Sequence, residues 1–323
     1  PPANMPPCLL NHPRRRRPMG ACRLASLAAA LLPGTFALRS RGALLGDEAG
    51  ARPGEPTRQE LENLQDLQYF GEVAIGGQTV KGILDTGSFE IVAFSQRCST
   101  CGTAGKYNEQ SSSSFAKGTL RQEEHAYGSG SCWANDGYDT VSAAGFAAQK
   151  QALWVATSCD MPLLGTAKFQ AIVGLGPPGE PVDTATQNLL DLKEDAKSIK
   201  NGDVRAQSDM ARQLESAETE LRVARSKPAM LENFGVSAFS QCLGKAPGSP
   251  GWLVWNDAKR ADRPGVQKLR VAGNITWGVT VTGLKLGSRS DGKSIACASG
   301  CVGIVDTGTS LFAVPTKLYN QIF

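Results

Sequence analysis

Most apolar segments of the chain are short and bounded by glycine or polar residues. Such runs stand at 72–75, 81–84, 91–94, 239–243, 251–254 and 277–281. Short apolar runs between turn-forming residues are typical of β-strands. The pattern therefore predicts a chain that is mostly β, with a first strand-rich part that ends near Gly176.

Residues 180–227 have a different pattern. Their apolar positions after Asp203 have a spacing of four, three, four and three: Met210, Leu214, Ala217, Leu221 and Ala224. This spacing places them on one helix face. We therefore expect a helical insertion over 177–230. It is either a partner-binding helical hairpin, a solvated surface insertion or a retained exon, and the mixed charges favour the solvated insertion.

Two apolar runs end in the same tripeptide. Gly82-Ile83-Leu84 precedes Asp85-Thr86-Gly87, and Gly303-Ile304-Val305 precedes Asp306-Thr307-Gly308. A strand that runs into Asp-Thr-Gly places a carboxylate on a tight turn, where glycine lets the backbone bend. One such tripeptide is often only a turn. Two facing copies would share one proton, so one carboxylate could activate a water while the other protonates a carbonyl.

At these residues the chain resembles the pepsin-like aspartic proteinases, from about Leu61 to the C-terminus. Further motifs in the family's order are 61–64 with 69–71, Tyr127-Gly128-Ser129-Gly130, 137–141, Ile172-Val173-Gly174, and Cys297 with Cys301. The resemblance implies an all-β, two-lobed β-barrel proteinase fold and an aspartic endopeptidase most active in acid. It implies a polypeptide substrate, a monomer, and neither a cofactor nor a metal.

The resemblance also implies a role for each matching residue. Asp85 and Asp306 would be the catalytic pair, supported by Thr86, Gly87, Ser88, Thr307, Gly308 and Thr309. Tyr127 and Gly128 would form the tip of a flap that closes over substrate. The substrate cleft would be lined by Ile83, Leu163, Phe169, Ile172 and Ile304. The chain departs from the family at Val92, where a tryptophan usually supports the flap tyrosine.

The two Asp-Thr-Gly motifs differ in the length of chain beyond them. Asp85 to Gly174 spans 89 residues, whereas 17 residues come after Asp306. We therefore expect an extension at 1–58, an N-terminal lobe at 59–176, the insertion, and an incomplete C-terminal lobe at 231–323. Two alternatives to an active proteinase are a non-catalytic peptide-binding homologue and a single-lobe proteinase that dimerises.

The net charge of +4 comes from the extension, because residues 1–58 carry a net charge of +6 and the remainder a net charge of −2. No nucleic-acid partner is expected from this distribution. Residues 19–37 contain an apolar run and a small-residue cleavage site, which predicts a secretory signal; an Arg-rich transit or disordered segment is the alternative. The expected location is the secretory pathway, extracellular or lysosomal/vacuolar. No stretch is apolar enough to span a membrane.

The nine cysteines suit an ordinary secreted enzyme. The family spacing makes Cys297–Cys301 the best disulfide candidate and Cys98–Cys101 the next, while the pairing of Cys132, Cys159 and Cys242 stays open. A zinc site made of Cys98, Cys101, Cys297 and Cys301 is the alternative. Histidine chemistry would depend on His125, since His12 lies in the extension.

Overall fold

The computed structural model of the protein describes residues 8–11, 55–119, 122–177, 179–199, 203–273, 275–287 and 292–322. The predicted signal at 19–37 and the segment up to residue 54 lie outside these described residues. Strands dominate the described chain, and most of them join one large mixed sheet. The all-β fold class predicted from the sequence is confirmed.

The strands and helices succeed one another in a clear order along the chain. The strands are β1 (Cys8–Asn11), β2 (Thr57–Leu64), β3 (Gln68–Ile75), β4 (Gln78–Asp85), β5 (Ile91–Phe94), β6 (Ala116–Lys117), β7 (Glu123–Tyr127), β8 (Gly130–Ala143), β9 (Phe146–Asp160), β10 (Ala171–Gly174), β11 (Phe239–Cys242), β12 (Gly251–Trp255), β13 (Gly278–Val281), β14 (Leu284–Leu286), β15 (Lys293–Ala296) and β16 (Cys301–Ile304). The α-helices are α1 (Glu180–Ser198), α2 (Val204–Ser226), α3 (Met230–Asn233) and α4 (Thr316–Ile322).

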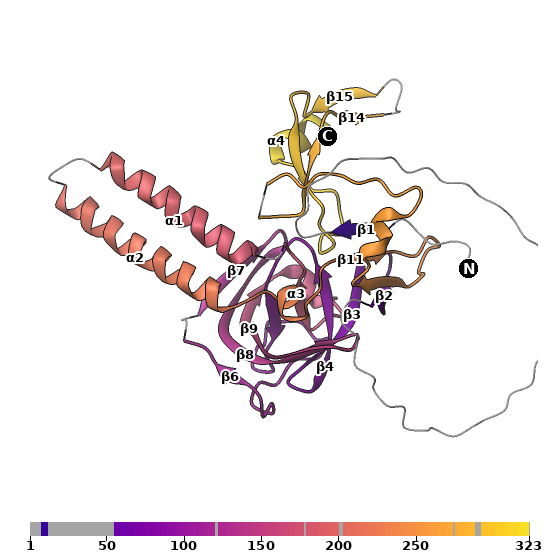
Figure 1. Ribbon diagram of the computed structural model, residues 1–323, viewed down its shortest axis with the longest axis horizontal. Coiled ribbons are helices and arrows are strands. Elements are labelled where there is room, and N and C mark those ends of the chain that lie inside the picture. Colours follow the sequence, from indigo (N-terminus) through magenta and orange to yellow (C-terminus); the bar gives the residue numbers. More distant parts are fainter. Residues whose placement is uncertain are drawn as a thin grey trace, which may run out of the picture.

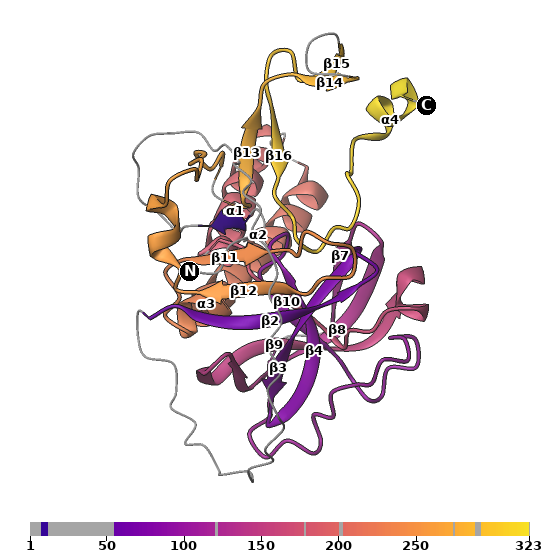
Figure 2. The same cartoon turned by 90° about the vertical axis from the view of Figure 1, so that its right-hand side faces the viewer.

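The first lobe is a sheet that closes on itself. Its strands lie in the order β3-β4-β10-β5-β9-β8, and β8 pairs again with β3 through Ala74↔Ser142 and Ile75↔Val141. On the other side of β3 the sheet continues through β2, β12 and β11 (Figures 1 and 2). The last neighbour is β1, from the predicted extension, which pairs antiparallel with β11. Part of the extension is therefore a strand of the main sheet.

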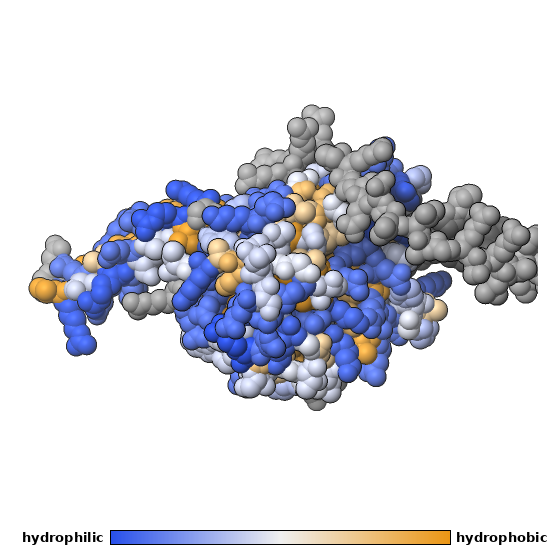
Figure 3. Space-filling model, turned by 90° about the horizontal axis from the view of Figure 1, so that it is seen from below, coloured by the Kyte–Doolittle hydropathy of each residue, from blue (hydrophilic) through white to orange (hydrophobic). Residues whose placement is uncertain are grey.

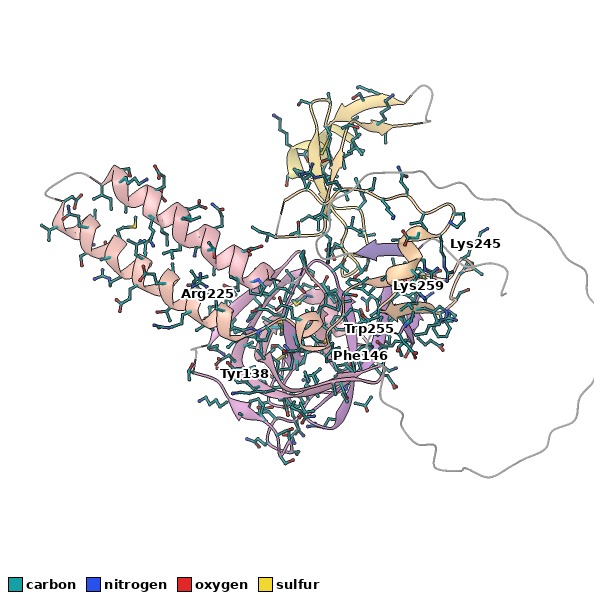
Figure 4. The ribbon with its side chains drawn as sticks, in the orientation of Figure 1. Tyr138, Phe146, Arg225, Lys245, Trp255 and Lys259 are labelled. Carbon is teal, nitrogen blue, oxygen red and sulfur yellow. A yellow bond between two sulfur atoms is a disulfide. The ribbon has the colours of Figure 1, made fainter. Side chains whose placement is uncertain are left out.

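Aromatic side chains join the closed sheet to the strands that come after the insertion. Phe146 of β9, Phe234 and Trp255 of β12 form a cluster whose ring centroids are 5.9–6.0 Å apart. Figure 4 shows Phe146 and Trp255 inside the β-rich body. All three side chains are buried, so this cluster fixes the position of β12 against the first lobe.

The predicted insertion is a helical hairpin that projects from the β-rich body (Figure 1). It has a small core of its own, made of Ala185, Leu189, Ala217 and Leu221. Lys193 and Glu218 add an exposed ion pair between α1 and α2. The face of the hairpin that Figure 3 shows is mostly hydrophilic. These features are typical of a solvated hairpin that buries its apolar stripe against itself.

The chain after Trp277 forms much smaller units. β13 pairs with β16, and β14 pairs with β15, each as a two-stranded sheet. Figure 2 shows these strands and α4 standing outside the main sheet. Large apolar side chains are exposed here, including Val302, Leu311 and Phe312. Two strands alone offer few neighbours to cover such side chains.

Three disulfides join pairs of cysteines that both lie within the described residues. They are Cys98–Cys101, Cys132–Cys159 and Cys297–Cys301. Cys132 and Cys159 stand directly opposite each other on β8 and β9. Cys242 is also in a disulfide. The four cysteines of the alternative zinc site are therefore bonded to one another in two pairs, Cys98–Cys101 and Cys297–Cys301, which leaves no thiolate to bind the metal.

Candidate active site

The first Asp-Thr-Gly loop leaves the middle of the closed sheet. β4 ends at Asp85 with β3 on one side and β10 on the other. The backbone N–H of Leu175 donates to the carbonyl of Asp85 at 2.6 Å, which holds the chain after β10 behind the loop. Gly174 is required there, because a Cβ at this position would lie 2.4 Å from the backbone of Phe89. Asp85 is consequently buried on a well-supported turn.

The second Asp-Thr-Gly loop comes after β16, and Trp277 provides one of its attachments to the first lobe. The N–H of Val305 donates to the carbonyl of Trp277 at 3.0 Å. The indole N–H of Trp277 donates in turn to the carbonyl of Leu175 at 2.8 Å, and its ring is buried in the core of the first lobe. Trp277 thereby joins the second loop to the chain segment that supports the first.

The two loops are locked together by reciprocal hydrogen bonds of Thr86 and Thr307. The hydroxyl of Thr86 donates to the carbonyl of Val305 at 2.7 Å and accepts from the N–H of Thr307 at 2.9 Å. The hydroxyl of Thr307 donates to the carbonyl of Leu84 at 2.5 Å and accepts from the N–H of Thr86 at 3.0 Å. This approximate twofold arrangement brings residues more than 200 positions apart to one point.

Each carboxylate is oriented by its own loop. In the first loop, Asp85 accepts from the N–H of Gly87 at 2.8 Å and from the hydroxyl of Ser88 at 2.6 Å. In the second, Asp306 accepts from the N–H of Gly308 at 2.7 Å and from the hydroxyl of Thr309 at 2.5 Å. The two sets of contacts repeat each other atom for atom, so both carboxyl groups are held in matching orientations.

The glycines of the two loops let each carboxylate approach the opposite backbone. A Cβ on Gly87 would lie 2.6 Å from the carboxyl carbon of Asp306, and a Cβ on Gly308 would lie 2.4 Å from Oδ1 of Asp85. No side chain fits at such distances. The structure therefore brings Asp85 and Asp306 together across the two glycines.

This environment changes the acidity of the first carboxyl group. Burial raises the pKa of Asp85 to about 6, and the nearby carboxyl of Asp306 adds to the rise. The hydrogen bonds from Ser88 and Gly87 act in the opposite direction, because they stabilise the ionised form. At pH values between its ordinary pKa and about 6, the carboxyl group of Asp85 therefore keeps its proton.

Most of the apolar residues expected near the pair belong to one cluster in the first lobe. Ile83, Phe169 and Ile172 are buried in it, and Leu163 packs against it. Tyr127 also packs against this cluster from β7, next to the exposed turn at Gly128. Ile304 lies elsewhere, on β16 opposite Gly278, and 57% of its surface is exposed.

Three residues near Tyr127 form a cluster that was not predicted from the sequence. His125 on β7, Glu90 after the first loop and Trp154 on β9 contact one another. Trp154 stands beside Val92 in the parallel pairing of β5 and β9. The absence of tryptophan at position 92 was visible in the sequence, but the pairing of distant strands was needed to find Trp154.

The described residues contain one group of cysteine sulfurs that are close enough to share a metal. The sulfurs of Cys98, Cys101 and Cys159 lie within 4.8 Å of one another. Each of these sulfurs already belongs to a disulfide, which excludes thiolate ligation in this state.

Comparison with known proteins adds evidence of a different kind. The family model described as "Eukaryotic aspartyl protease" matches residues 68–201 and 237–323. The chain is 32% identical over 277 residues to pepsin A of Canis lupus familiaris, an alignment that covers 84% of this chain and 61% of the relative. It is 28% identical over 293 residues to cathepsin D of Rattus norvegicus, covering 85% and 61% respectively. The chain thus spans about three-fifths of the length of these curated relatives.

Among the described helices, none is both long and apolar enough to cross a membrane.

Proposed function

The chain belongs to the eukaryotic aspartyl protease family, and we propose that it supplies the catalytic pair of an aspartic endopeptidase, Asp85 and Asp306. The observation that carries the proposal is the twofold arrangement of the two loops, in which Thr86 and Thr307 bond reciprocally. A pair of carboxyl groups so close together is suited to hold one proton between them.

The proposed reaction is hydrolysis of a peptide bond by general acid–base catalysis. A water molecule between the carboxyl groups loses a proton to the ionised carboxylate while its oxygen attacks the carbonyl carbon. The protonated carboxyl donates its proton to the carbonyl oxygen. Collapse of the tetrahedral intermediate then breaks the C–N bond, and the amine leaves with a proton from the pair. The raised pKa of Asp85 keeps the shared proton available up to about pH 6.

We further propose that the substrate is a polypeptide with apolar side chains beside the scissile bond. Ile83, Phe169 and Ile172 form the apolar cluster next to the first loop, and Tyr127 covers it from β7. Tyr127 and the exposed Gly128 at the end of β7 would close over the bound peptide. Ile304, which is exposed on β16, is not assigned to this surface.

The disulfides favour an oxidising compartment, so we propose a location in the secretory pathway, extracellular or lysosomal. Reduced thiols would predominate in the cytosol.

The test of the proposed function uses the natural protein in which this sequence occurs. It should cleave peptides with apolar residues at the scissile bond at acid pH, and a statine-type transition-state analogue should block the cleavage. Asp85→Asn should abolish turnover. A protein that binds the analogue but cleaves nothing would instead be a peptide-binding homologue.

A further inference from the structure

One strand of the hairpin that carries Tyr127 is tied to the first catalytic loop by a cluster of polar and aromatic side chains. On β7, His125 and Tyr127 are separated by one residue and therefore point to the same face of the strand. Both are half-buried, while the intervening Ala126 is exposed. A contact that holds His125 in place therefore also restrains the position of Tyr127 on the same strand.

His125 is fixed by Glu90. Its Nδ1 lies 2.9 Å from Oε2 of Glu90, which stands five residues after Asp85, beyond the first catalytic loop. Its Nε2 is buried and, within the part of the chain that the structure describes, has no hydrogen-bond partner. The proton is therefore best placed on Nδ1, from which the ring donates to Glu90 in its neutral or its charged state.

Trp154 completes the cluster from a third element, β9. Its indole N–H donates to Oε1 of Glu90 at 2.7 Å, so both oxygens of this carboxylate are engaged. Its ring meets the ring of His125 edge to face, with the centroids 4.5 Å apart. Three elements thus meet at one carboxylate: the strand of Tyr127, the segment after Asp85 and the neighbouring strand.

Trp154 lies beside Val92, the position at which the family tryptophan is absent. Val92 and Trp154 are direct partners in the parallel pairing of β5 and β9. An indole N–H is therefore present one strand away from the position where valine offers none. Tyr127 also lies within the influence of this cluster, because its pKa is raised by burial first and then by the negative charges of Glu90 and Asp85.

From this geometry we propose that Glu90, His125 and Trp154 are positioning residues. They hold β7, the strand that carries Tyr127, in a fixed position relative to the catalytic pair. The proposal rests on the proposed proteinase function only for its kinetic consequences. The structural part, that the cluster holds the Tyr127 hairpin, can be measured without any turnover.

Other charged groups surround the cluster and set the conditions of the test. Burial raises the pKa of Glu123 on the same strand; the charges of Glu90 and Glu220 add to the rise, and those of His125 and Lys227 oppose it. Lys227, at the end of α2, lies over the ring of Trp154 and pairs with Asp136 of β8. All variants are compared at one fixed pH, so that the charges around the cluster stay the same.

The central experiment removes the donor of His125 and then restores it. His125→Leu keeps an apolar side chain without a donor, whereas His125→Asn places an N–H near the position of Nδ1. We expect His125→Leu to speed hydrogen exchange of the amides at 123–130 about tenfold, the effect of one hydrogen bond to a charged group. Exchange in β3 and β4 should not change. His125→Asn should stay within about threefold of the wild type.

Kinetics provide the second measurement. The kcat/KM of His125→Leu should fall about tenfold, and binding of a statine-type analogue should weaken to the same extent. His125→Leu combined with Glu90→Gln should be no worse than the more damaging single change, because both changes weaken the same contact between His125 and Glu90. The matched control is Glu124→Gln, an exposed residue on the opposite face of β7, which should match the wild type.

The outcomes separate this inference from the proposed function. Unchanged exchange at 123–130 in His125→Leu, or equal effects of His125→Leu and His125→Asn, would overturn the positioning role. A wild-type protein that cleaves no peptide but shows the expected exchange pattern would overturn the catalytic assignment alone. If His125→Leu does not fold, Trp154→Phe removes the indole donor while keeping a smaller aromatic ring at this position. Roughly threefold faster exchange is then expected, and no change would count against the proposal.

Discussion

The two Asp-Thr-Gly loops have nearly the same local geometry but very different support. Asp85 ends a strand with neighbours on both sides, inside a sheet that closes on itself. Asp306 comes after β16, whose only strand partner in the described chain is β13. Both carboxylates nevertheless accept one backbone N–H and one hydroxyl at matching positions.

The difference shows that the geometry of the second loop is imposed largely by the first. Thr307 bonds to backbone groups of the first loop, and Trp277 bonds to the carbonyl of Leu175 behind it. Few contacts of its own hold the second loop, since Val302 and Ile304 on β16 are largely exposed. The first lobe therefore acts as the template, and the comparison can be tested at the carboxylates, the tryptophan, the shared proton and the inserted hairpin.

The largest effect is expected at the carboxylates themselves. If the two loops contribute equally to the reaction, Asp306→Asn should reduce peptide turnover as severely as Asp85→Asn. We expect losses of roughly 1,000-fold or more for each in the natural protein, because each change removes a group that must exchange a proton with substrate or water. Single-turnover peptide cleavage measures both variants. A mild effect of Asp306→Asn would show that the weakly supported loop contributes little to the reaction.

The next effect concerns the support of the second loop. Trp277→Ala should lower the free energy of unfolding by about 3–5 kcal/mol, because it empties a buried aromatic site and breaks the bond to Leu175. Trp133→Ala on β8 is the matched control, since 43% of that tryptophan is exposed. Urea denaturation of both variants gives the comparison. Equal destabilisation by the two changes would mean that Trp277 contributes little to the support of the second loop.

The local features of both loops could be predicted from the sequence, whereas their surroundings could not. Asp-Thr-Gly after an apolar run defines a turn that carries a carboxylate, and the turn is built from adjacent residues. The close disulfides Cys98–Cys101 and Cys297–Cys301 are equally local. The all-β class can be derived in the same way from short apolar runs.

Contacts between distant segments could not be predicted from the sequence. Cys132–Cys159 depends on the register of β8 with β9, which no single-strand pattern specifies. Trp154 joins Glu90 and His125 only because β9 pairs with β5 and β7 pairs with β8. The exposure of Ile304 depends on which strands pack beside β16, and this cannot be derived from the apolar run that contains it.

A smaller effect is expected from the shared proton. The pKa of Asp85 is about 6 in the folded protein against an ordinary value of 3.8, so the folded state binds more protons between these pH values. The free energy of unfolding should therefore fall as the pH rises through this range, by roughly 3 kcal/mol at most at about 1.4 kcal/mol per pH unit. Asp85→Asn should lose this dependence and be more stable than the wild type at pH 7 but not at pH 4.

Asp306→Asn sharpens the same measurement. Burial is the largest cause of the raised pKa of Asp85, and the charge of Asp306 comes after it. Asp306→Asn should therefore keep most of the pH dependence of stability that Asp85→Asn removes. Denaturant unfolding at pH 4, 5, 6 and 7 distinguishes the two variants. If both flatten the profile equally, the proton belongs to the pair as a unit and burial of Asp85 is the lesser cause.

The smallest effect is expected from the helical hairpin, whose apolar residues pack on each other and support neither loop. Deleting residues 183–226 should therefore leave turnover within about threefold of the natural protein, a change smaller than one hydrogen bond is worth. The deletion must keep Lys227, because this side chain pairs with the buried Asp136 at 2.8 Å and lies over Trp154. Lys227→Met in the undeleted protein is the matched test, and it should reduce stability more than the deletion does, since it removes a charge partner of a buried carboxylate. Loss of turnover in the deletion with the fold preserved would show that the hairpin belongs to the active site. With turnover intact, the contact of Lys227 with Trp154 would remain as a link between this insertion and the residues that position the flap.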